Sequence, residues 1–172
     1  MSKTLTAAAI AAVLATPAFA QGWYADVGYQ TLGFDEDEID VDLGAITGHF
    51  GYQLNQNFAL EGELGVGVKE ESFDVLGTDV DVELSYLVGA YVRGQVPVSE
   101  QLNLFARVGV VNAELSVEGG GFSESDSETG IGYGAGAEFM FNSTFGIRGD
   151  YTRYDIDDAE ADAFMIGAVF KY

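Results

Sequence analysis

The chain has 172 residues, with 28 Asp and Glu against 7 Lys and Arg, a formal net charge of −21 and no cysteine. Such acidity argues against nucleic acid as a partner, because binding phosphates requires clustered Lys and Arg. No stretch reaches the about 20 consecutive apolar residues of a transmembrane helix, although 48% of the residues are hydrophobic. The length fits a single domain.

The N-terminal segment has the pattern of a secretory signal peptide. A basic residue, Lys3, precedes an apolar run from Leu5 to Ala15, and the small residues Ala18 and Ala20 flank Phe19 before Gln21. This order of a basic start, an apolar run and a small-x-small site predicts cleavage after Ala20. We therefore expect residues 1–20 to be removed and residues 21–172 to form the mature domain outside the cytoplasm.

The mature chain consists of alternating segments. Apolar residues recur at every second position, the period of a β-strand, in eight runs: 23–34, 41–54, 58–69, 80–96, 104–117, 129–141, 145–156 and 163–172. Each run reaches or exceeds the about 9–11 residues that a tilted strand needs to cross a membrane.

The connections between these runs alternate in character. Short neutral connections follow the second, fourth and sixth runs, at 55–57, 97–103 and 142–144. The other four are rich in Asp and Glu and contain no Lys or Arg: "DEDEIDVD" from Asp35, "EESFDVLGTDVDVE" from Glu70, "ELSVEGGGFSESDSE" from Glu114 and "DIDDAEAD" from Asp155. One end of the protein is therefore intensely acidic, and an even number of strands leaves both termini at the other end.

The two faces of the strands differ in chemistry. In "GIGYGAGAEFMF", residues 130–141, one face carries Ile, Tyr, Ala and Phe, and the other carries four glycines and Glu138. A soluble barrel has no reason to expose glycine rows to water, whereas a narrow membrane barrel needs glycines opposite large lumen side chains. Strand edges in hydrocarbon must also be paired, so the sheet must close. The sequence predicts an all-β, eight-stranded antiparallel up-and-down transmembrane β-barrel.

This face assignment predicts two sets of residues. Charged residues on the glycine-rich face are expected to form an ion-pair network in the lumen, because buried charges need partners: Glu61, Glu63, Arg93, Arg107, Glu138, Arg148, Asp150 and Lys171. Aromatic residues beside the short turns or the termini are expected to form the periplasmic interfacial girdle: Trp23, Tyr52, Phe58, Phe141, Phe145, Phe170 and Tyr172.

Several segments carry a recognisable pattern: the signal peptide, "GYQLNQNFALEGELGVG" across the first short turn, "YGAGAEFMF" and "FGIRGDY" across the third, and the closing "GAVFKY". Together they resemble the OmpA-like or porin-family outer-membrane β-barrel domain of Gram-negative bacteria. In that family the last strand ends in an aromatic residue, with further aromatic or apolar residues at alternate positions before it. The resemblance implies that the outer-membrane assembly machinery recognises this strand, in which Tyr172 replaces the commoner Phe.

Two features of the sequence could indicate catalysis or metal binding, namely the single histidine and the acidic connections. His49 is the single histidine, and a hydrogen-bonded role in the lumen or rim is preferred to catalysis. "DIDDAEAD" is not an EF-hand loop, since Ala159 and Glu160 occupy positions that require other residues. We expect no cofactor, while loose binding of Ca²⁺ or Mg²⁺ by the loop carboxylates stays open beside a simply solvated acidic surface.

These observations predict a small integral outer-membrane β-barrel, in contact with lipid and lipopolysaccharide, with a structural or surface role and no enzymatic activity. A barrel of eight strands leaves no wide pore, so a resemblance to the porin family does not imply a wide channel here. Two alternatives remain open at this point: an adhesin or divalent-cation-binding surface protein acting through the acidic external loops, and a soluble ligand-carrying barrel.

Overall fold

The computed structural model describes residues 22–36, 39–69, 71–75, 78–119, 122–156 and 159–172. The expected signal peptide, with Ala18 and Ala20, lies outside these residues. The described residues form nine labelled strands: β1 (Trp23–Glu36), β2 (Ile39–Gln53), β3 (Phe58–Lys69), β4 (Glu71–Val75), β5 (Thr78–Pro97), β6 (Leu102–Gly119), β7 (Phe122–Met140), β8 (Phe145–Ile156) and β9 (Ala159–Lys171). In this part of the chain no helix is long and apolar enough to cross a membrane.

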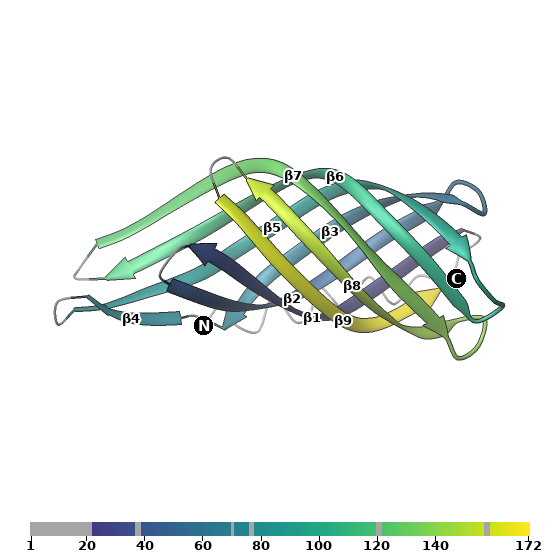
Figure 1. The fold of residues 1–172 in the computed structure, drawn as a ribbon, viewed down its shortest axis with the longest axis horizontal. Helices are drawn as coiled ribbons and strands as arrows, with labels where there is room; N and C mark the ends of the chain where they lie inside the picture. Colours follow the sequence, from purple (N-terminus) through teal and green to yellow (C-terminus); the bar gives the residue numbers. More distant parts are fainter. Residues whose placement is uncertain (1–21, 37–38, 70, 76–77, 120–121, 157–158) are drawn as a thin grey trace.

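The strands close into a barrel (Figure 1). All pairings are antiparallel and join neighbours along the chain, and β1 pairs with β9 to close the ring. Both β3 and β4 pair with β5, so these two strands follow one another along the same edge of β5 and count as one strand of the barrel. The nine labels therefore describe an eight-stranded up-and-down barrel, which confirms the predicted fold.

The strands are longer than predicted at the acidic end. β6 and β7 remain paired from Leu102↔Phe139 to Gly119↔Phe122, so most of the acidic stretch that begins at Glu114 is strand. The predicted runs end at Val117 and resume at Thr129, so they leave residues 118–128 as a connection, whereas β6 continues to Gly119 and β7 begins at Phe122. Leu115 and Val117 keep the period of two, and their positions opposite Asp126 and Glu124 continue the ladder.

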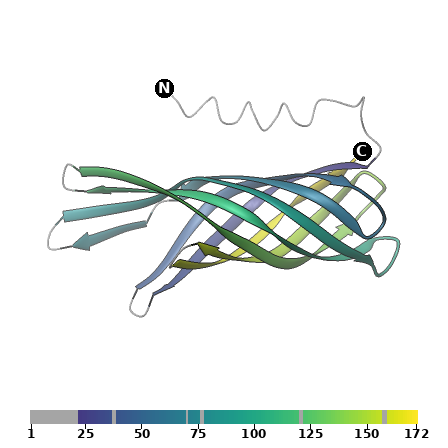
Figure 2. The same ribbon diagram turned by 90° about the horizontal axis from the view of Figure 1, so that it is seen from above.

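The opposite end is closed by three tight turns of one design. In the first, the backbone N of Leu54 donates to the carbonyl of Phe58 (2.9 Å), and Asn55 Oδ1 accepts from the backbone N of Phe58 (3.0 Å). Ser99 and Asn142 serve the other two turns in the same way. A side-chain oxygen that replaces a backbone acceptor stabilises such turns. Figure 2 shows the C-terminus at this end, opposite the projecting hairpins.

The outer wall is apolar and the interior is largely polar. Leu64 and Ile166 are 66% and 69% exposed, whereas Arg93 and Glu138 are 1% and 0% exposed. This arrangement is the reverse of a soluble barrel and suits a hydrocarbon solvent. The soluble ligand-carrying alternative is therefore wrong for this chain.

Candidate functional site

Glycines in β7 make space for large side chains in the lumen. A Cβ added at Gly132 would lie 2.5 Å from the hydroxyl of Tyr91, and one at Gly136 would lie 2.6 Å from Cζ of Phe105. Real Cβ atoms do not approach other heavy atoms this closely. The glycine row therefore lies where aromatic side chains from β5 and β6 cross the lumen.

Arg148 on β8 forms the centre of a buried cluster of charges. Its Nη1 lies 2.8 Å from Asp26 Oδ2 and 2.9 Å from Glu61 Oε2, and its Nε lies 2.8 Å from Asp150 Oδ2. All four side chains are almost completely buried. Because a guanidinium has five donors in a fixed plane, it can satisfy carboxylates from three strands at once.

His49 and Arg107 extend this cluster toward Glu63. His49 Nδ1 lies 2.6 Å from Asp26 Oδ1, and its Nε2 lies 2.8 Å from Glu63 Oε2. Arg107 Nη1 lies 2.5 Å from Glu63 Oε2 and 3.2 Å from Glu61 Oε1. Asp26 and His49 were absent from the expected network, although alternation already placed Asp26 on the charged face.

A second group of charges lies near the tight-turn end of the lumen. Glu138 Oε1 is 2.6 Å from Arg93 Nη1, and Glu138 Oε2 is 2.9 Å from Lys171 Nζ. The guanidinium of Arg93 also lies 3.9 Å from the ring centroid of Phe105, a distance suited to cation–π attraction. Arg93 Nη1 reaches Glu61 Oε2 at 3.3 Å, so the two groups of charges are joined.

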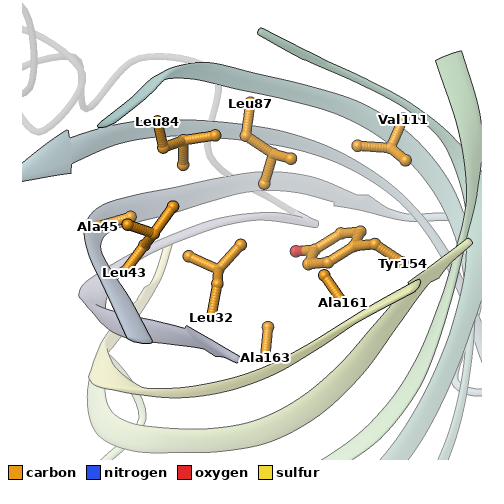
Figure 3. Packing of buried hydrophobic residues seen from close by; sticks show 9 residues of the cluster. All are labelled: Leu32, Leu43, Ala45, Leu84, Leu87, Val111, Tyr154, Ala161 and Ala163. Carbon is orange, nitrogen blue, oxygen red and sulfur yellow. The ribbon is translucent and has the colours of Figure 1, made fainter. Parts of the chain in front are cut away.

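An apolar layer fills the lumen toward the acidic end (Figure 3). Its buried members come from β1, β2, β5, β6, β8 and β9: Leu32, Leu43, Ala45, Leu84, Leu87, Val111, Tyr154, Ala161 and Ala163. The hydroxyl of Tyr154 joins this layer to the charges, since it donates to Glu63 Oε1 (2.7 Å) and accepts from Gln30 Nε2 (2.9 Å). Sequence reasoning missed the layer, although its signal was present as apolar residues on the lumen face beyond Gln30.

The aromatic residues expected at the tight-turn end lie on the outer wall in contacting pairs. Trp23 packs on Tyr52 with ring centroids 4.6 Å apart, and Phe145 contacts Phe141 and Phe170 at 5.7 and 5.2 Å. Phe58 and Tyr172 are exposed near the same rim. Such pairs add contact energy beyond the area they bury, and a ring at this height suits a lipid interface.

The outer wall becomes polar toward the acidic end. There Arg153 lies between two carboxylates of β9, with its Nη1 3.3 Å from Asp162 Oδ1 and its Nη2 paired with Glu160. Tyr151 donates to Asp162 Oδ1 at 2.6 Å. Among the residues that the structure describes, no group of three or more His, Cys, Asp or Glu side chains could hold a metal ion.

Comparison with known proteins agrees with this architecture. The curated attachment invasion locus protein of Yersinia pseudotuberculosis is 26% identical over 182 residues, covering 100% of this chain and 98% of that protein. Ail of Yersinia pestis, in its crystal structure with the heparin analogue sucrose octasulfate, superposes with a TM-score of 0.68 at 23% identity, covering 88% of this chain and 99% of Ail. The crystal structure of Neisserial surface protein A superposes with a TM-score of 0.70 at 13% identity, covering 90% of this chain and 100% of that protein.

The family model for the outer membrane protein beta-barrel domain matches residues 5–171, almost the whole chain. The chain is therefore a small β-barrel of the bacterial outer membrane and belongs to the outer membrane protein beta-barrel domain family.

Proposed function

We propose that this protein is a non-enzymatic attachment protein, whose closed barrel anchors an acidic β-sheet at the cell surface for contact with positively charged partners. The observation that carries this proposal is the filled lumen. Charged side chains around Arg148 and the apolar layer around Leu43 occupy its interior, which leaves no wide path for solutes. We therefore infer that the external hairpins, and not the lumen, bind the partners of this protein.

The relatives suggest attachment, but the chemistry of this chain suggests a different partner. Ail was crystallised with a heparin analogue, which is a sulfated polyanion. The four external stretches of this chain contain many Asp and Glu and no Lys or Arg. Like charges repel across a surface in low salt, so we infer that sulfated polyanions bind poorly and that basic proteins bind well.

Divalent cations offer a second route to an anionic partner. Ca²⁺ and Mg²⁺ prefer carboxylate oxygens, and the external stretches supply these in excess. We propose loose, exchangeable binding that lets the acidic end approach lipopolysaccharide phosphates or another acidic surface. A fixed cation cage is not part of this proposal.

The absence of catalysis is proposed from the environment of His49. A general base needs a free ring nitrogen that faces substrate. Both ring nitrogens of His49 lie within 2.8 Å of buried carboxylate oxygens of Asp26 and Glu63. A purely structural role for this histidine follows.

Export and assembly complete the proposal. Cleavage after Ala20 by signal peptidase and recognition of the strand that ends in Phe170 and Tyr172 by the assembly machinery fit the sequence patterns. In the structure that strand, β9, is the one that pairs with β1 to close the barrel.

A binding measurement on the full mature chain in nanodiscs tests the attachment role. The protein is passed over surfaces coated with polylysine or with heparin, with and without Mg²⁺. We expect binding to polylysine, and loss of that binding when Glu114, Glu118, Glu124, Asp126 and Glu128 are changed to Gln or Asn. Equal binding to both surfaces, or no effect of the substitutions, would contradict the proposal. Heat-modifiable gel migration checks that each variant is folded.

A further inference from the structure

The buried charges of the lumen do not balance unless the histidine there carries a proton. Among the described side chains, five carboxylates are buried, each at most 7% exposed: Asp26, Glu61, Glu63, Glu138 and Asp150. The permanent cations that pair with them are four: Arg93, Arg107, Arg148 and Lys171. One negative charge is therefore left over, and the partial exposure of Lys171 to water only increases the deficit of positive charge inside.

Both ring nitrogens of His49 lie against carboxylate oxygens from the two neighbouring strands. Nδ1 lies 2.6 Å from Asp26 Oδ1 on β1, and Nε2 lies 2.8 Å from Glu63 Oε2 on β3. An ionised carboxylate only accepts hydrogen bonds, so each nitrogen satisfies its partner only when it carries a hydrogen. A ring with hydrogens on both nitrogens is the imidazolium cation.

Arg107 on β6 lies close to the same ring. Its Nη1 is 2.7 Å from His49 Nε2 and 2.5 Å from Glu63 Oε2. A neutral ring could accept a hydrogen bond from Nη1, but the lone pair of Nε2 would then also face Glu63 Oε2, and the surplus negative charge would stay in the lumen. With an imidazolium ring, Nη1 and Nε2 both donate to Oε2, so the two cations share one carboxylate.

The other groups around the ring and its partners do not supply the missing positive charge. They are Glu61 on β3, Tyr91 on β5, and Arg148, Asp150 and Tyr154 on β8. The carboxylates and the guanidinium are already counted, and the two phenols are neutral near pH 7. Because an uncompensated charge inside a protein is costly, a bound proton is the remaining source of the fifth positive charge.

We propose that His49 is a buried proton-binding site, and that its imidazolium is the fifth cation of the lumen network at neutral pH. The folded barrel then holds one proton that the unfolded chain releases above about pH 6.5. The stabilisation by this proton is therefore complete below that pH and is lost as the pH rises. This role is separate from attachment, since it makes the stability of the barrel depend on pH.

Nuclear magnetic resonance of the full mature chain in nanodiscs observes this proton directly. The chain contains one histidine, so labelling histidine with nitrogen-15 gives signals from a single ring. We expect both ring nitrogens to carry hydrogen at about pH 8, where a histidine in water is neutral. A ring with only one hydrogen at that pH would overturn the proposal and would make Nε2 an acceptor from Arg107. This measurement needs no variant, so it decides the proposal even where a variant fails to fold.

Equilibrium unfolding in urea from lipid vesicles measures the pH dependence. Above about pH 7 the unfolding constant should rise up to tenfold per pH unit, the slope for one extra proton in the folded state. His49→Gln should lose this slope. The chain has no cysteine, so the α-amino group is the one other group that ordinarily titrates between about pH 7 and pH 8, and both proteins share it. A slope that persists in His49→Gln would place the proton on another group and contradict the proposal.

Two double variants separate charge balance in the lumen from the net charge of the protein. H49Q leaves the surplus negative charge, so it should unfold at a lower urea concentration than the unmodified protein. H49Q/D26N removes that surplus inside the lumen, whereas H49Q/D162N removes the same charge from the outer wall, where Asp162 is partly exposed beside Arg153. We expect recovery of the urea midpoint in the first double variant and none in the second. Equal midpoints for the two double variants would mean that balance in the lumen has no special role, and the proposal would be wrong.

Discussion

The hydroxyl of Tyr91 occupies the space that a Cβ at Gly132 would require, at a separation of 2.5 Å. The same side chain stacks under Arg107, whose guanidinium carbon lies 4.5 Å from the ring centroid. Glycine in β7 is therefore tied to the charges in the lumen, since a larger residue at position 132 would displace the ring that packs against Arg107.

Adding volume to the glycine row should destabilise the barrel. In Gly136→Leu, the new Cβ would lie 2.5 Å from Asp150 Cβ and 2.5 Å from the carbonyl oxygen of Gly149. That oxygen belongs to the backbone, so it cannot move aside as the end of a flexible side chain could. Overpacking of this kind costs about 1–3 kcal/mol. Equilibrium unfolding in urea from lipid vesicles measures the loss. Ala137→Leu on the outer wall is the matched control and should change little, so the opposite result would mean that the two faces are reversed.

Removing the central cation of the lumen should cost more. Arg148→Met leaves Asp26, Glu61 and Asp150 without their shared partner, and an uncompensated buried charge costs about 3–5 kcal/mol. Arg153→Met is the control, because Arg153 is partly exposed and its pairs compete with water. We expect a large fall in the urea midpoint for the first variant and little change for the second. Similar stability of the two variants would show that the buried pairs contribute no net stabilisation.

The alternation of residue types along each strand predicted correctly which side chains face outward and which face the lumen. Hydrocarbon requires apolar side chains on one face, and a narrow lumen requires small or paired polar side chains on the other. Thus Ile131 and Tyr133 lie exposed on the outer wall, and the glycine between them is buried. The fold, the strand order and the positions of the tight turns follow from this pattern and from the two classes of connection.

The pattern could not predict what depends on distances across the lumen. Arg148 meets Asp26, 122 positions away along the chain, because barrel closure brings β1 beside β9, next to β8. The apolar layer was missed for another reason: where Val111 faces the lumen, its neighbour Val110 is exposed on the outer wall, so apolar residues occur on both faces and the contrast between the faces weakens. The strand ends were misplaced because Asp and Glu are uncommon in strands, although register preserves the ladder there.

A charge on the outer wall should be costly in a manner that depends on membrane thickness. Ile166 lies on the same face of β9 as Phe164 and Phe170, between them, and is 69% exposed. Ile166→Arg places a cation against hydrocarbon, at about 2–4 kcal/mol near the midplane and less toward the interface. Refolding into bilayers of shorter acyl chains should reduce the loss, whereas Gly136→Leu should be insensitive to thickness. Ile166→Leu, the uncharged control, should refold normally, and an equal loss for Leu and Arg would argue against lipid contact.

The two layers of the lumen should keep the barrel closed independently of each other. The charges around Arg148 close one part, and the apolar residues Leu43 and Leu84 close the part toward the acidic end. In planar bilayers we expect no large stable open state, and at most small flickering currents. Leu84→Ser alone should stay closed because the ion pairs remain, and Arg148→Ala alone should stay closed because an apolar constriction excludes water. The double variant should conduct more than either single variant, provided that gel migration shows it to be folded. Sustained porin-like conductance from the unmodified protein would rule out a filled lumen and would return transport to consideration.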